Sequence, residues 1–466
     1  MAKYQAYAEY KDSGVEWLGV LPSHWTMNKL RYLFSFGKGL TITKENLMDE
    51  GIPCVSYGEV HSKYSFAVDP LKHHLKCVEE SYLKTSPNAL LQKGDFVFAD
   101  TSEDLKGSGN FTHLVNDEKV FAGYHTIIAR PQDQSVSRFY AYLFDSQEFR
   151  SQIQLAVKGV KVFSITQAML RAANIWLPSK AEKQNIANFL DHETAKIDHL
   201  IEKQQQLIEL LKEKRQAVIS HAVTKGLDPN VPMKDSGVEW LGEVPEHWGI
   251  WKFAHIAPII TCGVASTPTY VEEDVGMPFL SAQNIKNNKL SLHKFNYIPH
   301  SLHEQLTKYR KPELGDILVT RVGAGIGEAC IVDIDLEFSI YVSLTHIRVN
   351  SNIANNKFVM YFFGTDYCKF LNYEGTVTGG GVGNLNVNNV VKYKIALPSL
   401  QEQQKIVEYI DHYVTKQDEL ILKAESAISL MQERRTALIS AAVTGKIDVR
   451  NWQAPSVTEA DTELSA

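Results

Sequence analysis

The stretch Lys-Asp-Ser-Gly-Val-Glu-Trp-Leu-Gly occurs twice in this chain, at residues 11–19 and again at residues 234–242. A run of nine identical residues that includes a tryptophan points to duplication rather than to chance. Leu-Pro-Ser is repeated further along in the same order, at 177–179 and 397–399. A repeat this long indicates a tandem duplication of one large unit, because solenoid repeats have periods of about 20–50 residues. Two copies of a binding unit on one chain predict a target that also has two parts.

The bulk composition is that of an ordinary globular chain. Its 466 residues are 44% hydrophobic and 22% charged, enough for two or three cores. No apolar run approaches the roughly 20 residues that a membrane helix needs, and the first residues lack the apolar core of a signal peptide, so we expect a cytoplasmic protein. The five cysteines form no C-x-x-C pair, which argues against a disulfide framework or a zinc site. With a net charge of −6, any nucleic-acid contact must depend on local Lys and Arg patches.

Two long segments predict helices over 179–226 and 399–447, because neither contains glycine or proline until its end, near Gly226 and Gly445. Each begins with Ser followed three residues later by Glu, a capping box in which Ser caps the Glu amide and Glu reaches back to the Ser amide. Apolar residues then follow alternating three- and four-residue steps, the heptad period of a coiled coil. One-sided packing against a globular domain is the alternative. The predicted seams are Ile186, Leu190, Ile197, Leu200, Ile208, Leu211 and Val218, and Ile406, Ile410, Tyr413, Leu420, Ala424, Ile428, Met431, Leu438 and Ala442.

The length of these helices constrains the topology. A helix of about 40 residues advances the chain roughly 60 Å, and the connector at 226–232 is too short to return that distance. We therefore expect the helices to pair antiparallel, with one globular block at each end of a dumbbell. The blocks read as short strands and turns, so the predicted fold class is α+β, with two β-rich domains separated by a coiled-coil spacer. We call the Trp-containing segment before each block, which includes the repeated stretch, its lead-in. The expected domains are 1–178, the first lead-in and recognition block; 179–226, the first helix; 227–398, the linker, second lead-in and second block; 399–447, the second helix; and 448–466, a tail.

Motifs that would indicate catalysis are missing or have simpler explanations. The G-x-G-x-G run at 323–327 has the wrong spacing for a dinucleotide loop and reads as a hairpin between two strands. Asp95 with Asp104 and Lys106 could imitate nuclease carboxylates and a catalytic lysine, but the second copy has no equivalent lysine. No Asn/Asp-Pro-Pro-aromatic tetrapeptide, no phosphate-binding P-loop and no metal-ligand spacing among the sixteen histidines is present. We expect no catalytic residues, no metal and no cofactor.

Three features together resemble the specificity (S) subunits of type I restriction-modification systems. They are the repeated lead-in with its following Pro, His and Trp, the Leu-Pro-x-x-x-Glu-x-Gln start of each helix, and the Leu-x-Glu-x-Arg run at 211–215 with its near copy at 431–435. The resemblance covers nearly the whole chain, and the lead-in is its most characteristic part. It implies two target-recognition domains held apart by an antiparallel helical spacer, each reading one half of a split, asymmetric DNA sequence.

The resemblance also implies partners. Subunits of this family have no catalysis of their own and recruit two methyltransferase subunits and two ATP-dependent restriction subunits to double-stranded DNA. The missing methyltransferase and ATPase motifs fit that division of labour. A coiled-coil interaction scaffold without DNA specificity is the alternative, although it does not explain two divergent β-rich blocks on a common frame.

Polar loops stand at the same place in both copies, before Leu-Pro, and are candidates for DNA contact. Lysines there suit phosphates, whereas Gln, Asn and Arg suit base edges. Surface loops without a role would look much the same. The candidates in these loops are Lys158, Lys161 and Ser164 in the first copy and Asn384 in the second. Gln283, Asn284 and Arg321, elsewhere in the second block, are further candidates.

The lead-in tryptophans should be structural. Their large apolar side chains would tie each domain to the distant end of a helix, and losing one from a core costs about 3–5 kcal/mol. The residues concerned are Trp17, Trp25, Trp240 and Trp248.

Overall fold

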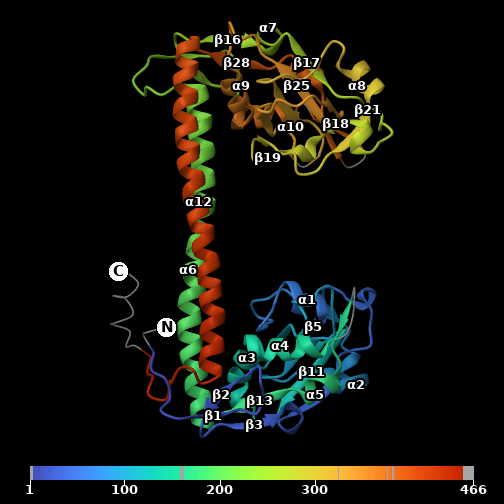
Figure 1. The fold of residues 1–466 in the computed structure, drawn as a ribbon, viewed down its shortest axis with the longest axis vertical. Helices are drawn as coiled ribbons and strands as arrows, with labels where there is room; N and C mark the ends of the chain where they lie inside the picture. Colours follow the sequence, from blue (N-terminus) through green and yellow to red (C-terminus); the bar gives the residue numbers. More distant parts are fainter. Residues whose placement is uncertain (1–3, 158–161, 324, 375, 380–381, 455–466) are drawn as a thin grey trace. The chain divides into compact units, whose positions relative to one another are not determined.

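The computed structural model describes residues 4–157, 162–323, 325–374, 376–379 and 382–454, which fold into two compact units. Unit 1 combines the residues up to 204 with those from 426 onward, and unit 2 spans 205–425. Each unit contains a domain of short strands and helices together with a stretch of both long helices (Figure 1). The two ends of the chain therefore belong to the same unit.

The domain of unit 1 is built on a four-stranded antiparallel sheet of order β4-β11-β7-β9, beside a three-stranded sheet of order β10-β5-β6. Helices α3 (Ser137–Asp145) and α4 (Gln147–Ala156) pack on it with aromatic side chains. The Phe144 ring lies 5.0 Å from that of Phe96 between centroids. Every residue of β7 is buried, as expected of a strand covered on both faces. The strands are β4 (Phe34–Lys38), β5 (Ile52–Val55), β6 (Cys77–Val78), β7 (Phe96–Ala99), β9 (Phe111–His113), β10 (Phe121–Ala122) and β11 (Thr126–Pro131).

Unit 2 repeats this topology, with sheets of order β17-β25-β22-β23 and β21-β18-β24. In both units the central strand of the three-stranded sheet has one parallel and one antiparallel neighbour. Antiparallel pairing of β22 with β23 confirms the hairpin predicted around the G-x-G-x-G run. The strands are β17 (Ile259–Cys262), β18 (Gly276–Leu280), β21 (Asn296–Pro299), β22 (Ile317–Thr320), β23 (Ala329–Ile331), β24 (Ser339–Ile340) and β25 (Leu344–Arg348).

A buried aspartate–arginine pair recurs at the same place in both sheets. The fully buried Asp95 accepts hydrogen bonds from Nε and an Nη of Arg130 at 2.9 and 2.7 Å. In unit 2, Asp316 accepts from Arg348 at 2.8 Å and from His346 Nε2 at 2.7 Å. Burial alone would raise the pKa of Asp316, but the bonds from His346 and Arg348 outweigh it and hold that pKa below its ordinary value. The carboxylate of Asp95 is thus engaged in holding strands together.

Each domain closes where its first strand pairs with its last. Strand β3 (Thr26–Lys29) pairs with β13 (Asn174–Leu177), and β16 (Gly249–Lys252) pairs with β28 (Lys394–Leu397). Both pairings are antiparallel, so the lead-in before the first strand and the helix after the last strand start from the same edge of the domain.

The long helices are α6 (Lys180–Lys225) and α12 (Leu400–Val443). At each start, the serine hydroxyl oxygen accepts the backbone N–H of the glutamate at 3.3 Å, from Glu182 to Ser179 and from Glu402 to Ser399. This half of the predicted capping boxes is confirmed. The glutamate carboxylates have other partners, described below.

Within each unit the two helices pair antiparallel. In unit 1, Arg435 of α12 donates to Asp198 of α6 at 2.9 Å, and Asn185 near the start of α6 donates to the carbonyl of Arg450, beyond the end of α12, at 3.0 Å. In unit 2, Arg215 of α6 donates to Asp418 of α12 at 2.8 Å. The arginine that ends each Leu/Met-x-Glu-x-Arg run is therefore an interhelical contact.

The predicted seam is correct for most positions, including the buried Ile186, Leu190 and Ile410. It is wrong for Leu200 and Leu420, which are 49% and 38% exposed. A helix of 3.6 residues per turn drifts by about 20° per heptad, so a strict seven-residue step carries these side chains out of the seam.

The repeated stretch itself forms the same turn twice. The Ser13 N–H donates to the Gly19 carbonyl at 2.9 Å, and the Ser236 N–H donates to that of Gly242 at 3.0 Å. Gly19 and Gly242 have φ of +70° and +64°, a left-handed conformation that glycine adopts without strain. The turn explains why both glycines close the repeated sequence.

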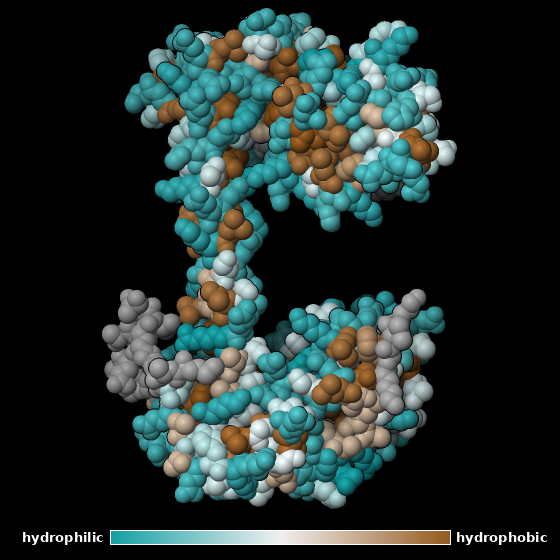
Figure 2. All heavy atoms as spheres, viewed as in Figure 1, coloured by the Kyte–Doolittle hydropathy of each residue, from teal (hydrophilic) through white to brown (hydrophobic). Residues whose placement is uncertain are grey.

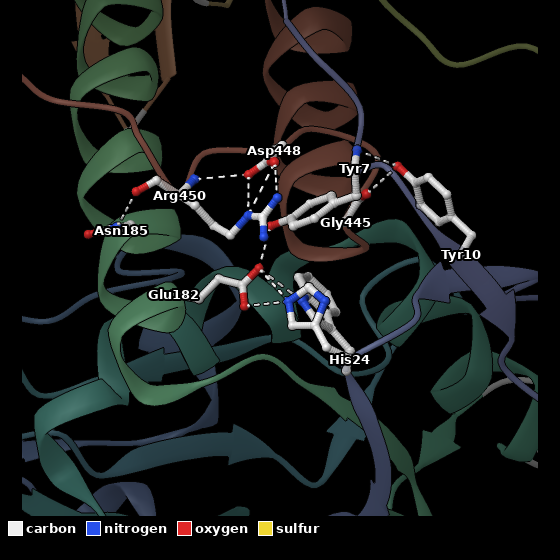
Figure 3. A network of polar contacts seen from close by, with 9 residues as sticks. Tyr7, Tyr10, His24, Glu182, Asn185, Gly445, Asp448 and Arg450 are labelled. Atoms are coloured by element: carbon white, nitrogen blue, oxygen red, sulfur yellow. Dashed lines mark hydrogen bonds and ion pairs between the residues drawn. The ribbon is translucent and has the colours of Figure 1, made fainter.

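In unit 1 the lead-in grips the capping glutamate of α6 (Figure 3). The Glu182 carboxylate, almost fully buried, accepts from the Tyr7 hydroxyl at 2.5 Å, from Trp25 Nε1 at 3.0 Å and from His24 Nε2 at 3.0 Å. Burial and the bond to Glu182 raise the pKa of Tyr7, so its hydroxyl keeps its proton and donates. The Arg450 guanidinium lies 4.9 Å from the centre of the Tyr7 ring and so brings the C-terminal segment to the same cluster.

Unit 2 repeats the grip with fewer partners. Glu402 accepts from Trp248 Nε1 at 3.1 Å and from His247 Nε2 at 2.8 Å, and its side chain is 32% exposed. The structural role predicted for Trp25 and Trp248 is confirmed, since both are fully buried. Trp240 differs, because it packs on Phe370 at 4.4 Å between ring centroids yet is 61% exposed.

Candidate nucleic-acid interface

In unit 2, two of the predicted DNA-contact residues lie side by side. Arg321 follows β22, and Asn384 lies on β27 (Val382–Leu385), which forms a hairpin with β26 (Thr376–Gly379). An Nη of Arg321 donates to Asn384 Oδ1 at 2.8 Å, and Nε donates to the Leu385 carbonyl at 2.9 Å. Arg321 is only 9% exposed, so its guanidinium holds the hairpin to the sheet, whereas Asn384 is exposed.

The other two predicted residues of unit 2 lie on the 3-10 helix Ala282–Asn284. Asn284 is buried: its amide nitrogen donates to the carbonyls of Ser291 and Lys294 at 2.9 Å each, and its oxygen accepts the Ser281 N–H at 3.0 Å. These bonds shape the loop and leave no free donor or acceptor for a base. Gln283 is exposed beside it.

Ser343 joins these two parts of the surface. Its hydroxyl oxygen accepts the Ala282 N–H at 2.9 Å, and its carbonyl accepts the Arg321 N–H at 2.9 Å. Gln283, Arg321 and Asn384, which are far apart in the sequence, therefore border one surface of unit 2. Gln283 and Asn384 are its exposed members, while Arg321 and Asn284 support it.

In unit 1, Lys158 and Lys161 lie outside the described residues. Ser164 is exposed on β12 (Phe163–Ser164), which pairs with β8 (Thr101–Ser102). The next residue, Ile165, donates its N–H to the Asp100 carbonyl at 2.8 Å, just as Leu385 donates to the Arg321 carbonyl at 2.8 Å. Ser164 and Asn384 thus occupy equivalent positions, as the placement of the two loops predicted.

The same matching of backbone bonds locates residues that sequence reasoning missed. The Asp100 N–H donates to the His125 carbonyl at 3.1 Å, as Arg321 does to Ser343. The Ser56 N–H donates to the Glu59 carboxylate at 3.1 Å, as Ser281 does to Asn284. Tyr57, Asp100 and His125 therefore stand where Ala282, Arg321 and Ser343 stand in unit 2. The Ser-x-x-Glu of 56–59 and the Ser-x-x-Asn of 281–284 were the sequence signal for this equivalence.

A cleft lies beside this surface in each unit. In unit 2 it has a volume of 490 Å³ and is lined by Lys212, Lys289 and Lys369 among others. Its counterpart in unit 1 has a volume of 680 Å³ and is lined by Lys106 and Arg150. Cations at such positions suit the phosphates of a nucleic-acid backbone.

Asp191 and Asp411, each followed by a histidine on a long helix, make structural contacts. Asp191 accepts from Arg138 at 2.6 Å and from the Tyr142 hydroxyl at 2.7 Å, both on α3. Asp411 accepts from Lys357 at 2.7 Å on α9 (Asn356–Phe363). Each aspartate thus anchors a helix of its own domain to the long helix.

The described part of the chain holds no group of three or more His, Cys, Asp or Glu side chains that could bind a metal ion. None of its helices is long and apolar enough to cross a membrane.

Comparison with known proteins gives consistent matches over both halves of the chain. The family model described as "Type I restriction modification DNA specificity domain" matches residues 22–210 and 245–429. The type I restriction enzyme EcoKI specificity subunit of Escherichia coli K12 is 22% identical over 460 residues, which cover 96% of this chain and 94% of the relative. The StySPI specificity subunit of Salmonella potsdam is 23% identical over 456 residues, covering 94% and 92%. A chain from a solved structure of a type I R-M system shares the fold with a TM-score of 0.65, at 16% identity, covering 92% of this chain and 99% of that one.

Proposed function

Because the chain belongs to the type I restriction-modification DNA specificity family, we propose that it is the sequence-specific DNA-binding subunit of such a complex. Residues 1–178 and 227–398 supply two recognition domains, each reading one half of a bipartite, asymmetric target in double-stranded DNA. The chain directs two methyltransferase subunits and two restriction subunits to that target in the cytoplasm, and it catalyses no reaction itself.

The observation that carries this proposal is a common frame with two different exposed surfaces. Both units repeat the sheet order, the buried aspartate–arginine pair and the grip on the capping glutamate. At this surface, however, unit 1 has Asp100 and the exposed His125 where unit 2 has the buried Arg321 and Ser343, and unit 2 exposes Gln283 instead. A frame kept twice with divergent polar side chains is what reading two unrelated half-sites requires, because base identity is read by side-chain donors and acceptors.

We propose that phosphate contacts depend on individual cations, since Glu328 and Asp418 line the unit 2 cleft as well. The cleft of unit 2 has Lys212, Lys289 and Lys369 in its wall. In unit 1, we propose that Lys158 and Lys161 contact phosphate. Each phosphate contact releases counterions, so binding should weaken steeply as salt increases.

Partner subunits need a surface of their own, and the long helices supply one. Figure 2 shows hydrophobic side chains at the surface of these helices. We infer that partners cover these side chains, because contiguous exposed apolar patches mark interaction sites. The exposed leucines are Leu200 and Leu430 in unit 1, and Leu207, Leu210, Leu420 and Leu422 in unit 2.

The test is to express the full chain with its methyltransferase subunits in a host without other adenine methylation and to map methylated adenines across the genome. We expect methylation at one motif made of two unlike half-sites with a fixed gap. Purified chain without partners should show no methyl transfer. Methylation without the chain, or with no defined motif in its presence, would refute the proposal.

The exposed leucines also favour a second candidate, a coiled-coil scaffold that binds proteins without DNA specificity. Binding of random-sequence duplex by the purified complex separates the two. For a DNA-recognition subunit, the logarithm of the binding constant should fall linearly with the logarithm of the salt concentration. A scaffold should bind its partners equally well with and without DNA and show no such dependence.

A further inference from the structure

An aspartate–histidine pair stands on the unit 1 surface at the positions of Arg321 and Ser343 in unit 2. His125 Nδ1 lies 3.1 Å from Asp100 Oδ1, with 57% of the histidine side chain and 34% of the aspartate side chain exposed. A hydrogen bond at the surface contributes little to stability. The pair therefore has no evident structural purpose.

Two tyrosines fix the plane of the histidine ring. The ring meets Tyr57 edge to face at 5.7 Å and Tyr124 at 6.0 Å between centroids. Within the described residues no hydrogen bond is made by Nε2, the opposite ring nitrogen. The two tyrosines thus orient the histidine ring, and Nε2 stays available for a hydrogen bond.

The backbone at this position is strained. His125 has φ of +54°, in the left-handed region that residues other than glycine rarely adopt. The turn that contains it is tightly closed, since the Thr126 hydroxyl donates to the Gly123 carbonyl at 2.6 Å. Such strain is unfavourable and clusters at functional sites. Glycine at this position would relieve the backbone strain, so the presence of histidine indicates a function for its side chain.

We propose that the Asp100–His125 pair is a base-reading element of unit 1, and that it recognises an exocyclic amino group in the major groove. This deepens the proposed function and rests on it. In the tautomer whose Nδ1–H donates to Asp100, the unprotonated Nε2 is an acceptor. The neighbouring carboxylate is a second acceptor. In the major groove the donors that match them are the adenine N6 and cytosine N4 amino groups, whereas guanine and thymine present acceptors.

Unit 2 cannot use the same chemistry at these positions. The Arg321 guanidinium is occupied by Leu385, Val342 and Asn384, and the Ser343 hydroxyl oxygen accepts the Ala282 N–H. The exposed amide of Gln283 offers both a donor and an acceptor instead. The two units therefore offer different groups to a base, and from different positions on the common frame.

The experiment maps methylation sites for the full chain with its methyltransferase subunits, comparing the unaltered protein with His125→Gly and Asp100→Asn. Glycine removes the side chain and adopts the left-handed conformation without strain. We expect the preference at one position of the unit 1 half-site to fall by roughly 10-fold or more in His125→Gly, with the other half-site unchanged. Asp100→Asn should change the same position. His199→Ala, a change at an exposed histidine on α6, is the control and should leave both half-sites unaltered.

The outcomes are distinguishable. An unchanged unit 1 half-site in His125→Gly and Asp100→Asn overturns the inference and leaves the proposed function standing. Equal loss of preference at both half-sites also overturns it, because the pair belongs to unit 1 alone. If the unaltered chain directs methylation to no defined sequence, the proposed function itself fails. Should a variant methylate too weakly to map, selection of bound duplexes from a random pool by the purified complex gives the same readout.

Discussion

Removal of the capping glutamates should affect the two units unequally, although the residues are equivalent in sequence. We consider Glu182→Ala in unit 1 and Glu402→Ala in unit 2. Both changes put a good helix former in the first turn and remove one negative charge near a helix N-terminus, so the intrinsic effects on the helices cancel in the comparison. Any difference must come from the groups that each carboxylate binds.

The contacts predict the size of that difference. In unit 1, Glu182→Ala leaves the buried Trp25 Nε1 and Tyr7 hydroxyl without an acceptor. A buried donor left unpaired costs about 1–3 kcal/mol, so we expect a loss of about 3 kcal/mol. In unit 2, Glu402→Ala leaves only one buried donor, Trp248 Nε1, without its acceptor. The half-exposed His247 can hydrogen-bond to water instead. We expect about 1 kcal/mol there.

Calorimetric unfolding of the full chain, with hydrogen exchange to assign the loss to a unit, measures both effects. For units of this size, 1 kcal/mol shifts the melting temperature by about 2–4 °C, so unit 1 should lose roughly 6–12 °C in Glu182→Ala. Tyr7→Phe supplies an internal check. It should destabilise the unaltered protein but stabilise Glu182→Ala, because it then removes an unpaired hydroxyl. Equal losses from the two alanine variants, or the same sign for Tyr7→Phe in both backgrounds, would refute the reasoning.

Three further predictions concern the ion pairs, the DNA contacts and the helices. Asp316→Asn should destabilise unit 2 by about 3–5 kcal/mol at neutral pH, as breaking a buried pair does. Because the pKa of Asp316 is held below its ordinary value, the Asp316 carboxylate stabilises the fold above that ordinary value, and this stabilisation disappears as the pH falls. The difference in unfolding free energy between the unaltered chain and Asp316→Asn should therefore shrink below about pH 4. A constant difference down to about pH 2 would contradict this. Lys158→Ala and Lys161→Ala should weaken binding to every duplex and lower the slope of log affinity against log salt by about one unit per contact. Gln283→Ala should instead relax base preference in one half-site only. Identical binding profiles for the lysine and glutamine variants would show that these roles are wrong. A matched insertion of four residues in both long helices adds about 6 Å and should widen the gap between half-sites by one or two base pairs without altering either, as methylation mapping would reveal.

Local signals were sufficient to predict most of the frame. The helices α6 and α12 follow from serine caps, a heptad pattern and the absence of glycine and proline, all of which act within a few residues. The failures at Leu200 and Leu420 have a geometric origin, since the pattern counts steps whereas burial depends on the accumulated angle around the helix. The capping-box prediction failed in part because the glutamate carboxylate accepts hydrogen bonds from other side chains instead of from the serine backbone amide. The lead-in that competes for Glu182 comes from a distant part of the sequence.

The surface was harder to predict, because sequence cannot show which polar groups are already satisfied. Asn284 and Arg321 are polar residues beside turns, as expected of base contacts, but tertiary folding brings main-chain carbonyls to them. Asp100 and His125 were missed for the opposite reason. Nothing near either residue marks it, and only the pairing of their backbones places them at one spot. The lysines at 158 and 161 remain a prediction.

The proposed recognition positions differ from the contacts of the common frame in what they contribute to stability. The contacts they share are buried and charge-assisted, such as Asp95 with Arg130 and its counterpart in unit 2, and removing either partner of such a pair is costly. The positions that differ, such as His125 and Gln283, are exposed, and exposed substitutions usually change stability by less than about 0.5 kcal/mol. Specificity can therefore be altered at these positions while the unfolding free energy stays nearly constant. Accordingly, His125→Gly should melt within about 2 °C of the unaltered chain even where its methylation motif has changed.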